Sequence, residues 1–241
     1  MKNQYLADIN DFKKYGLLRS ILAATNWKLT VAWMLTPDDG STDGAKRAYL
    51  DQPQRYRKHD PELFDRLSEV AGRERPTVAE IREAGVLDGA VLLEDVLPAT
   101  AGTRARWLKA LLERSSDSDI VFLDPDNGIE VKSVAFGGRN AHKYVFWREL
   151  EAIWGLGKSL FVYQHFPREE RRSYMTRMIR SLSGRLDGAT VTGFRTANVV
   201  FFLVTQPGED SAHLRIRRAV ADQWGTLVSE FRVVTLGAQK L

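Results

Sequence analysis

The chain has no cysteine, which excludes disulfide bonds and metal sites built from thiolates. It also has no uninterrupted run of about 18 apolar residues, so the sequence predicts no membrane-spanning helix. The first residues, 1–5, are not followed by an apolar stretch of the kind that signal peptides contain. These absences together lead us to expect a cytoplasmic protein that does not associate with membranes.

Three common catalytic motifs are missing as well. The chain contains no Gly-x-x-x-x-Gly-Lys phosphate loop, no His-x-x-x-His zinc motif and no recognisable order of serine, histidine and aspartate. The sequence therefore offers no support for nucleotide hydrolysis by a phosphate loop, for zinc chemistry or for a hydrolase triad.

What is present is typical of one globular domain. The 241 residues are 44 % hydrophobic and 27 % charged, with a formal net charge of +4. A mild positive charge serves solubility as well as nucleic-acid binding. Arginines, however, cluster at 55–58, 168–180 and 215–218, and this clustering favours DNA or RNA as a partner. The sequence does not indicate an oligomeric state.

Apolar runs and helical patterns alternate along the chain. Strands are expected at Lys28–Thr36, Val91–Leu93, Ile120–Leu123, Ser159–Tyr163, Thr190–Arg195, Asn198–Thr205 and Phe231–Leu236. Helices are expected at Asp11–Ala24, Pro61–Val70, Thr77–Ala84, Thr103–Arg114, Trp147–Trp154, Arg168–Leu182 and His213–Trp224. This order predicts an α/β three-layer sandwich, a Rossmann-like mixed sheet with a C-terminal antiparallel hairpin. We expect a single domain, 1–241, in which residues 45–90 form a possible helical insertion.

Two local expectations can be checked directly. In the first helix, Asn10 or Asp11 is a plausible N-cap, and Lys13, Lys14 and Arg19 fit a solvated face. The polar, glycine-rich segment 131–143 is expected to be a loop.

The stretch Asp119–Glu130 organises the chain. Its apolar run predicts a strand buried on both faces, and the strand ends at Asp124, Asp126 and Asn127. In open parallel sheets, ligands bind beyond the carboxyl ends of the strands. We therefore expect the functional site at this turn.

Two further turns should lie at the same edge of the sheet, namely residues 36–44 and 164–166. Crowded carboxylates need a cation or a donor-rich ligand, and two chemistries satisfy that need. One is a nucleoside-type cofactor. The other is Mg²⁺ held by Asp38, Asp39, Asp124 and Asp126. Two plainer interpretations stay open: Asp-Pro-Asp-x-Gly is also ordinary turn chemistry, and His165 is either a general base or a structural residue.

The order of these pieces resembles one known family. Phe122-Leu123-Asp124-Pro125-Asp126-Asn127 is similar to the apolar run and Asp-Pro-Pro-Tyr-Glu motif of the bacterial 23S rRNA adenine-N6 methyltransferases. The segment 157–167, followed by the basic helix 171–179, resembles the next strand and helix of that family. Near the start, Ala7-Asp8 and Lys14-Tyr15 resemble its Ala-Asp-x-x-Lys-His motif, with three extra residues between them.

The resemblance implies the class I methyltransferase fold, S-adenosylmethionine as cofactor and nucleic acid as substrate. It places Asp124, Asp126, Asn127 and Lys14 at the catalytic subsite. The cofactor would be held by the turn after the strand 28–36 and by the acid after the short strand 91–93. These cofactor-binding residues are Thr36, Asp38, Asp39, Gly40, Gly44 and Asp95.

At the catalytic motif, Asp126 stands in place of the family's second proline and Asn127 in place of its tyrosine. In the family that aromatic ring stacks on the flipped adenine. Three hypotheses follow: a nucleic-acid methyltransferase with an altered motif, a Mg²⁺-dependent nuclease or phosphoesterase, and a non-catalytic methyltransferase-like binding module.

Overall fold

The computed structural model describes residues 1–37, 46–98 and 100–233. Its α-helices are α1 (Ile9–Ala24), α2 (Pro53–Tyr56), α3 (Pro61–Ala71), α4 (Val78–Glu83), α5 (Ala101–Arg114), α6 (Trp147–Trp154), α7 (Arg171–Arg185) and α8 (Asp210–Trp224). Its strands are β1 (Leu29–Ala32), β2 (Val91–Leu93), β3 (Ile120–Leu123), β4 (Gly128–Ile129), β5 (Tyr144–Val145), β6 (Ser159–His165), β7 (Thr190–Arg195), β8 (Val199–Thr205) and β9 (Ser229–Phe231).

The main sheet has seven strands in the order β2-β1-β3-β6-β8-β7-β9. The first four are parallel to one another, and β8 is antiparallel to both β6 and β7. The predicted α/β fold with a mixed sheet and a late antiparallel hairpin is therefore confirmed. The last strand ends at Phe231, earlier than the sequence indicated, and residues 234–236 lie outside the described residues.

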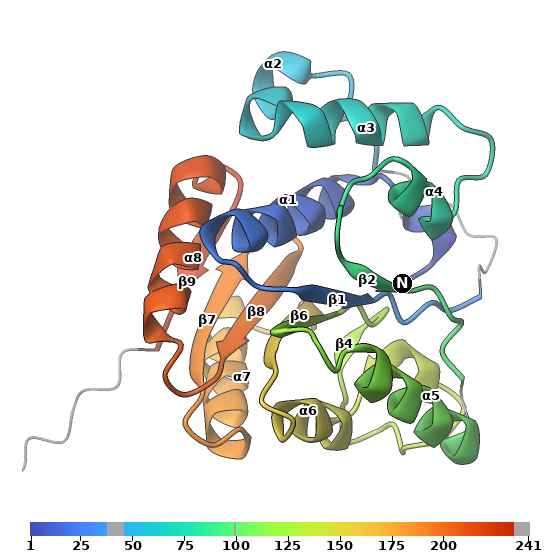
Figure 1. Ribbon diagram of the computed structural model, residues 1–241, viewed down its shortest axis with the longest axis vertical. Helices are drawn as coiled ribbons and strands as arrows, with labels where there is room; N and C mark the ends of the chain where they lie inside the picture. Colours follow the sequence, from blue (N-terminus) through green and yellow to red (C-terminus); the bar gives the residue numbers. More distant parts are fainter. Residues whose placement is uncertain (38–45, 99, 234–241) are drawn as a thin grey trace, which may run out of the picture.

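Helices cover both faces of this sheet (Figure 1). One face carries α1, α3 and α8, whose apolar side chains, among them Phe12, Leu67 and Trp224, pack against alternate residues of the strands. The other face carries α5, α6 and α7, and its core includes Leu111 and Met175. Burial of both faces explains why β3 is apolar throughout and why β1 has a single polar residue, the buried Thr30.

Residues 46–90, between β1 and β2, are largely helical. They contain α2, α3 and α4, with Pro61 in the first turn of α3. Asp60 caps α3 by accepting a hydrogen bond from the backbone N–H of Leu63 at 3.0 Å.

Helix α1 differs from expectation at its start and on its surface. Its N-cap is Asp8, whose carboxylate accepts from the backbone N–H groups of Asn10 and Asp11; neither of those residues is the cap. The predicted solvated face is wrong for Lys13 and Lys14, which are both buried. The reason is that α1 packs on the sheet and is contacted by both α3 and α8.

The approach of α8 depends on Gly16. A Cβ atom at this position would lie 2.0 Å from Cζ2 of Trp224, so only glycine lets the indole ring rest against the backbone of α1. The indole N–H of Trp224 also donates to Ser20 Oγ at 3.1 Å. These two contacts fix the close approach of α8 to α1.

Beyond β3, residues 131–143 form turns and one 3₁₀ segment, in agreement with the predicted loop. The short parallel pair β4 and β5 that encloses this loop was not predicted. Within the described parts of the chain, no helix combines the length and the apolarity that crossing a bilayer needs.

Candidate functional site

The topology creates a crevice between β1 and β3. The chain leaves β1 towards β2 on one side, and it leaves β3 towards β6 on the other. Adjacent strands whose connections run in opposite directions mark the point where open α/β sheets bind ligands. Asp124 follows β3 directly, and its backbone N–H donates to the carbonyl oxygen of Ala32 at 3.1 Å.

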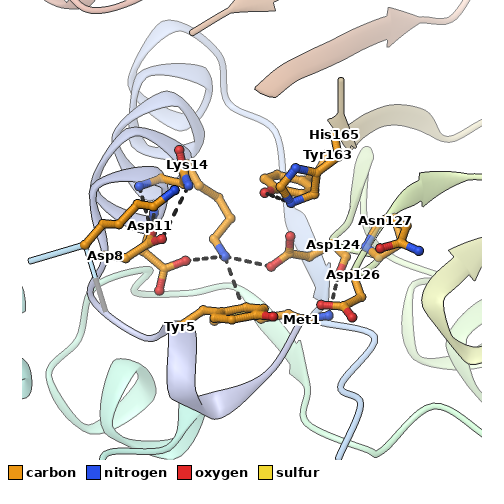
Figure 2. A pocket seen from close by; sticks show the side chains of 13 residues that line it. Met1, Tyr5, Asp8, Asp11, Lys14, Asp124, Asp126, Asn127, Tyr163 and His165 are labelled. Carbon is orange, nitrogen blue, oxygen red and sulfur yellow. Dashed lines mark hydrogen bonds and ion pairs between the residues drawn. The ribbon is translucent and has the colours of Figure 1, made fainter. Parts of the chain in front are cut away.

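A cavity of about 260 Å³ lies at this point (Figure 2). Its walls come from the start of the chain, from α1, from the turn after β3 and from the end of β6. The lining residues are Met1, Tyr5, Asp8, Asn10, Asp11, Lys14, Lys46, Asp124, Pro125, Asp126, Asn127, Tyr163 and His165. Four segments far apart in sequence, 1–14, 46, 124–127 and 163–165, therefore meet at one cavity.

The centre of the cavity is a buried ammonium between two carboxylates. Nζ of Lys14 lies 2.6 Å from Oδ2 of Asp124 and 2.6 Å from Oδ1 of Asp11. All three side chains are no more than 4 % exposed. Burial disfavours the ammonium, but the charges of Asp11 and Asp124 outweigh it and raise the pKa of Lys14 well above its ordinary value. Lys14 therefore stays charged and fixes one oxygen of Asp124.

A further carboxylate, Asp8, stands beside this group. Burial, followed by repulsion from Asp11, raises the pKa of Asp8 to about 7. Burial also raises the pKa of Asp11. Asp11 in turn accepts the backbone N–H of Ala7 at 2.9 Å and supports that residue in the left-handed region, with φ of 59°. Strained backbone of this kind is often found at functional sites.

The turn that carries Asp126 and Asn127 is held on two sides. The backbone N–H of Asn127 donates to the carbonyl oxygen of Lys143 at 2.8 Å, beside the β4–β5 pair. The side chain of Gln164 donates to the carbonyl oxygen of Asn127 at 3.2 Å and accepts the N–H of Ile129 at 2.8 Å. Both side chains of the turn therefore face the cavity from a braced backbone.

A buried ion pair anchors the segment 141–144, whose Lys143 carbonyl oxygen binds the turn. Arg104 of α5 binds Glu149 of α6 through Nε–Oε1 at 2.6 Å and Nη2–Oε2 at 2.8 Å. The same guanidinium donates to the carbonyl oxygens of Ala141 (3.2 Å) and Tyr144 (2.7 Å), next to Lys143. The geometry of the turn that carries Asp126 and Asn127 thus depends on a charge pair outside the cavity.

At the mouth, β6 contributes Tyr163 and His165. The tyrosine hydroxyl lies 2.9 Å from Nε2 of His165, and their rings are nearly perpendicular. Loss of water around the imidazole lowers the pKa of His165, although Asp126 and Asp124 oppose the shift. Burial raises the pKa of Tyr163 well above its ordinary value. The histidine is therefore neutral near pH 7 and has a polar partner.

The structure brings together four of the residues predicted for the site, Lys14, Asp124, Asp126 and Asn127. Thr36 is buried outside the lining, and its backbone N–H donates to the carbonyl oxygen of Met1 at 2.8 Å. Asp95 is exposed at the end of β2, with Arg114 3.8 Å away, and does not line the cavity.

The other residues proposed for the cofactor, Asp38, Asp39, Gly40 and Gly44, lie outside the described residues, as does half of the proposed Mg²⁺ set. Among residues 1–37, 46–98 and 100–233, no group of three or more histidine, aspartate or glutamate side chains is arranged to hold a metal ion. Of the four carboxylates in the Mg²⁺ hypothesis, Asp124 and Asp126 both line the cavity.

Sequence reasoning missed the role of Asp11 and the contribution of Tyr163. The spacing of Asp11 and Lys14, three residues apart on one helix, was visible and allows an ion pair. The burial of both residues was not visible, because it depends on β3 and α8. The chain matches no protein-family model, no curated protein and no solved structure.

Proposed function

We propose that the cavity is the catalytic site of an S-adenosylmethionine-dependent methyltransferase that modifies an amino group on a nucleic-acid base. The observation that carries this proposal is the buried Asp124 at the point between β1 and β3, with Lys14 fixed on its Oδ2. The resemblance of residues 122–127 to the family motif identifies the same carboxylate as the acceptor for the substrate amine.

The charges of the cavity fit such a cofactor. S-adenosylmethionine carries a sulfonium and an ammonium. Four aspartates, Asp8, Asp11, Asp124 and Asp126, line the cavity with two lysines and the amino group of Met1, whose pKa burial lowers to about 6. When bound, this cofactor supplies an electrophilic methyl group. Asp126 and Asn127 would complete the catalytic subsite beside Asp124, and the turn after β1 would hold the cofactor, as the family resemblance implies.

The protein's own residues then have separate tasks. Asp124 accepts a hydrogen bond from the amine at Oδ1 and orients its nitrogen, while Lys14 keeps the carboxylate from rotating. The nitrogen gains a methyl group and loses one proton. His165, neutral at the mouth of the cavity, can take that proton on its ring.

The Mg²⁺ hypothesis is less compatible with these contacts. Mg²⁺ requires oxygen ligands at about 2.1 Å, whereas Lys14 already occupies Oδ2 of Asp124. A metal bound by Oδ1 of Asp124 and by Asp126 would lie close to this buried ammonium, and the two positive charges would repel each other.

Calorimetric titration with millimolar S-adenosylmethionine, followed by transfer of labelled methyl groups to total RNA and denatured DNA, tests the proposal. We expect binding by the wild-type protein and about 100-fold slower transfer by Asp124→Asn, since misplacement of the reacting nitrogen by about 1 Å can cost about 10²-fold. Asp187→Asn, at an exposed aspartate, is the matched control and should leave transfer unchanged.

Absence of binding heat with folded protein would refute the methyltransferase proposal. Cleavage of labelled RNA that requires Mg²⁺ and stops in EDTA would favour the nuclease hypothesis. Nucleic-acid binding that is indifferent to Asp124→Asn, without turnover, would favour the non-catalytic module.

A further inference from the structure

A second hollow opens beside the mouth of the cavity. It is an open groove of about 610 Å³ between the end of β6, the start of α7 and the turn of the β7–β8 hairpin. Its lining residues are Lys46, His165, Phe166, Pro167, Arg168, Glu169, Arg171 and Asn198. Lys46 and His165 also line the cavity, so the two hollows are continuous.

The groove is positively charged. Lys46, Arg168 and Arg171 are exposed in it, and among the described residues none of the three forms an ion pair. Its one carboxylate, Glu169, is bound by both Nη atoms of Arg177, at 2.6 and 2.9 Å, which lowers the pKa of Glu169. The local charge is therefore suited to an anion.

The groove also offers a partly apolar surface. The guanidinium of Arg171 lies 5.1 Å from the centre of the half-buried Phe166 ring. An arginine stacked on an aromatic ring presents a flat cationic face, and such faces pack on nucleobases while remaining able to bind phosphate. Asn198, exposed at the hairpin turn, adds an amide donor and acceptor.

We propose that this groove binds the phosphate backbone of an unpaired nucleic-acid strand, next to the nucleotide whose base enters the cavity. The path of the strand would run from the cavity mouth, past Lys46 and His165, along Arg168 and Arg171. The assignment of the reacting base rests on the proposed function, whereas binding of the strand in the groove does not.

The depth of the cavity explains why the strand must be unpaired. Asp124 is only 2 % exposed, so an amine that reaches it must leave any base stack and enter the protein. Extrusion of a paired base costs a few kcal/mol, and this cost is smallest for a strand that is already single. A duplex would also need room for a second backbone at the mouth.

Fluorescence anisotropy with a labelled single-stranded oligonucleotide tests this inference without any cofactor. DNA and RNA of one sequence form separate arms, and a blunt duplex of the same sequence serves as competitor. The variants are Arg168→Glu, Arg171→Glu and their combination. Arg218→Glu, which reverses an exposed arginine on α8 at the opposite face of the sheet, is the matched control.

We expect each groove variant to weaken single-strand binding about tenfold and the control to change it less than about twofold. The slope of log affinity against log salt should fall by about 0.7 for each arginine lost, so by about 1.4 in the double variant. The duplex should bind at least about tenfold more weakly than the single strand.

Equal losses in the control and in the groove variants would overturn the assignment of the groove. Duplex binding as tight as single-strand binding would overturn the requirement for an unpaired strand. If S-adenosylmethionine binds while no oligonucleotide does, the groove inference fails and the methyltransferase proposal stands with a smaller amine substrate. If the oligonucleotide binds while S-adenosylmethionine does not, the methyltransferase proposal fails and the groove inference stands.

Discussion

The buried pair of Arg104 and Glu149 gives the most quantitative test of how the site is supported. Both side chains are 1 % exposed. Oε2 of Glu149 accepts two hydrogen bonds, from Nη2 of Arg104 and from the backbone N–H of Phe146 at 2.9 Å, while Oε1 accepts Nε. Glu149→Gln keeps the shape of the side chain but puts an NH₂ group against at least one of these donors.

The expected loss is large. Removal of one partner of a buried pair costs about 3–5 kcal/mol, because the other charge stays in the interior. Against a total stability of about 5–15 kcal/mol for a domain, Glu149→Gln should remain folded but unfold at clearly lower urea. The double variant Arg104→Met with Glu149→Leu removes both charges and should recover part of the loss. It will not recover all of it, because the carbonyl groups of Ala141 and Tyr144 lose their donor.

The control lies two residues further along the same helix. Glu151 binds Arg185 at 3.1 Å, and both side chains are about half exposed. Glu151→Gln should therefore cost less than about 1 kcal/mol. Urea unfolding followed by circular dichroism measures both variants. Similar losses at Glu149 and Glu151, or a loss below about 1 kcal/mol at Glu149, would contradict the structural role assigned to the buried pair.

Two further predictions concern acid stability and the turn that carries Asp126 and Asn127. His213 is buried between the hydroxyls of Thr192 (2.8 Å) and Thr205 (3.0 Å), and burial lowers its pKa from 6.5 to about 4. The unfolded chain therefore binds one more proton between pH 6.5 and 4, so the free energy of unfolding falls by about 3 kcal/mol as pH falls through this range. The urea midpoint of His213→Gln should change less with pH than that of the wild-type protein. Parallel plots of urea midpoint against pH for the two proteins would disprove this. Gly128 has φ of 118°, and a Cβ atom there would lie 2.3 Å from the Gln164 amide. Gly128→Ala should lower the free energy of unfolding by at least about 1 kcal/mol, seen as a lower thermal midpoint, and should weaken ligand binding. Gly184→Ala, whose Cβ atom would meet no atom within 4 Å, should be neutral or stabilising. Equal behaviour of the two variants would contradict the crowding argument.

The strands β2 and β3 were predictable because their residues are uniformly apolar and sharply bounded. Ile120–Leu123 stands between two aspartates, and Val91–Leu93 matches β2 at both ends. The hairpin was also visible, since β7 and β8 are separated by only a short turn. Burial on both faces leaves a signal in sequence that does not depend on distant neighbours.

Helix boundaries depend on capping contacts and were less predictable. The sequence indicated that α7 would begin at Arg168, but it begins at Arg171 because Glu170 accepts the backbone N–H groups of Arg172 and Ser173. The N-cap of α1 was predicted at Asn10 or Asp11 instead of Asp8 for the same reason. Several acidic residues stood near each start, and only the folded backbone selects one of them.

The candidate site was predictable in part. The strand-end position of Asp124 follows from the parallel sheet, and Lys14 entered through a family resemblance. The contact between Lys14 and Asp124 joins residues 110 positions apart, and no local pattern encodes it. Asp95 shows the converse: the end of a strand was located correctly, yet the side chain lies beside Arg114.

The contact of Gly16 with Trp224 has a consequence for any attempt to divide the protein. All residues that line the cavity lie between Met1 and His165. A fragment ending after β6 would therefore carry every lining side chain, yet it would lack the indole that packs against the backbone of α1 at Gly16, two residues from Lys14. Such a fragment would contain the residues of the site but not the helix contact that supports them. Complementation with a second fragment that carries α8 would be needed to restore the site.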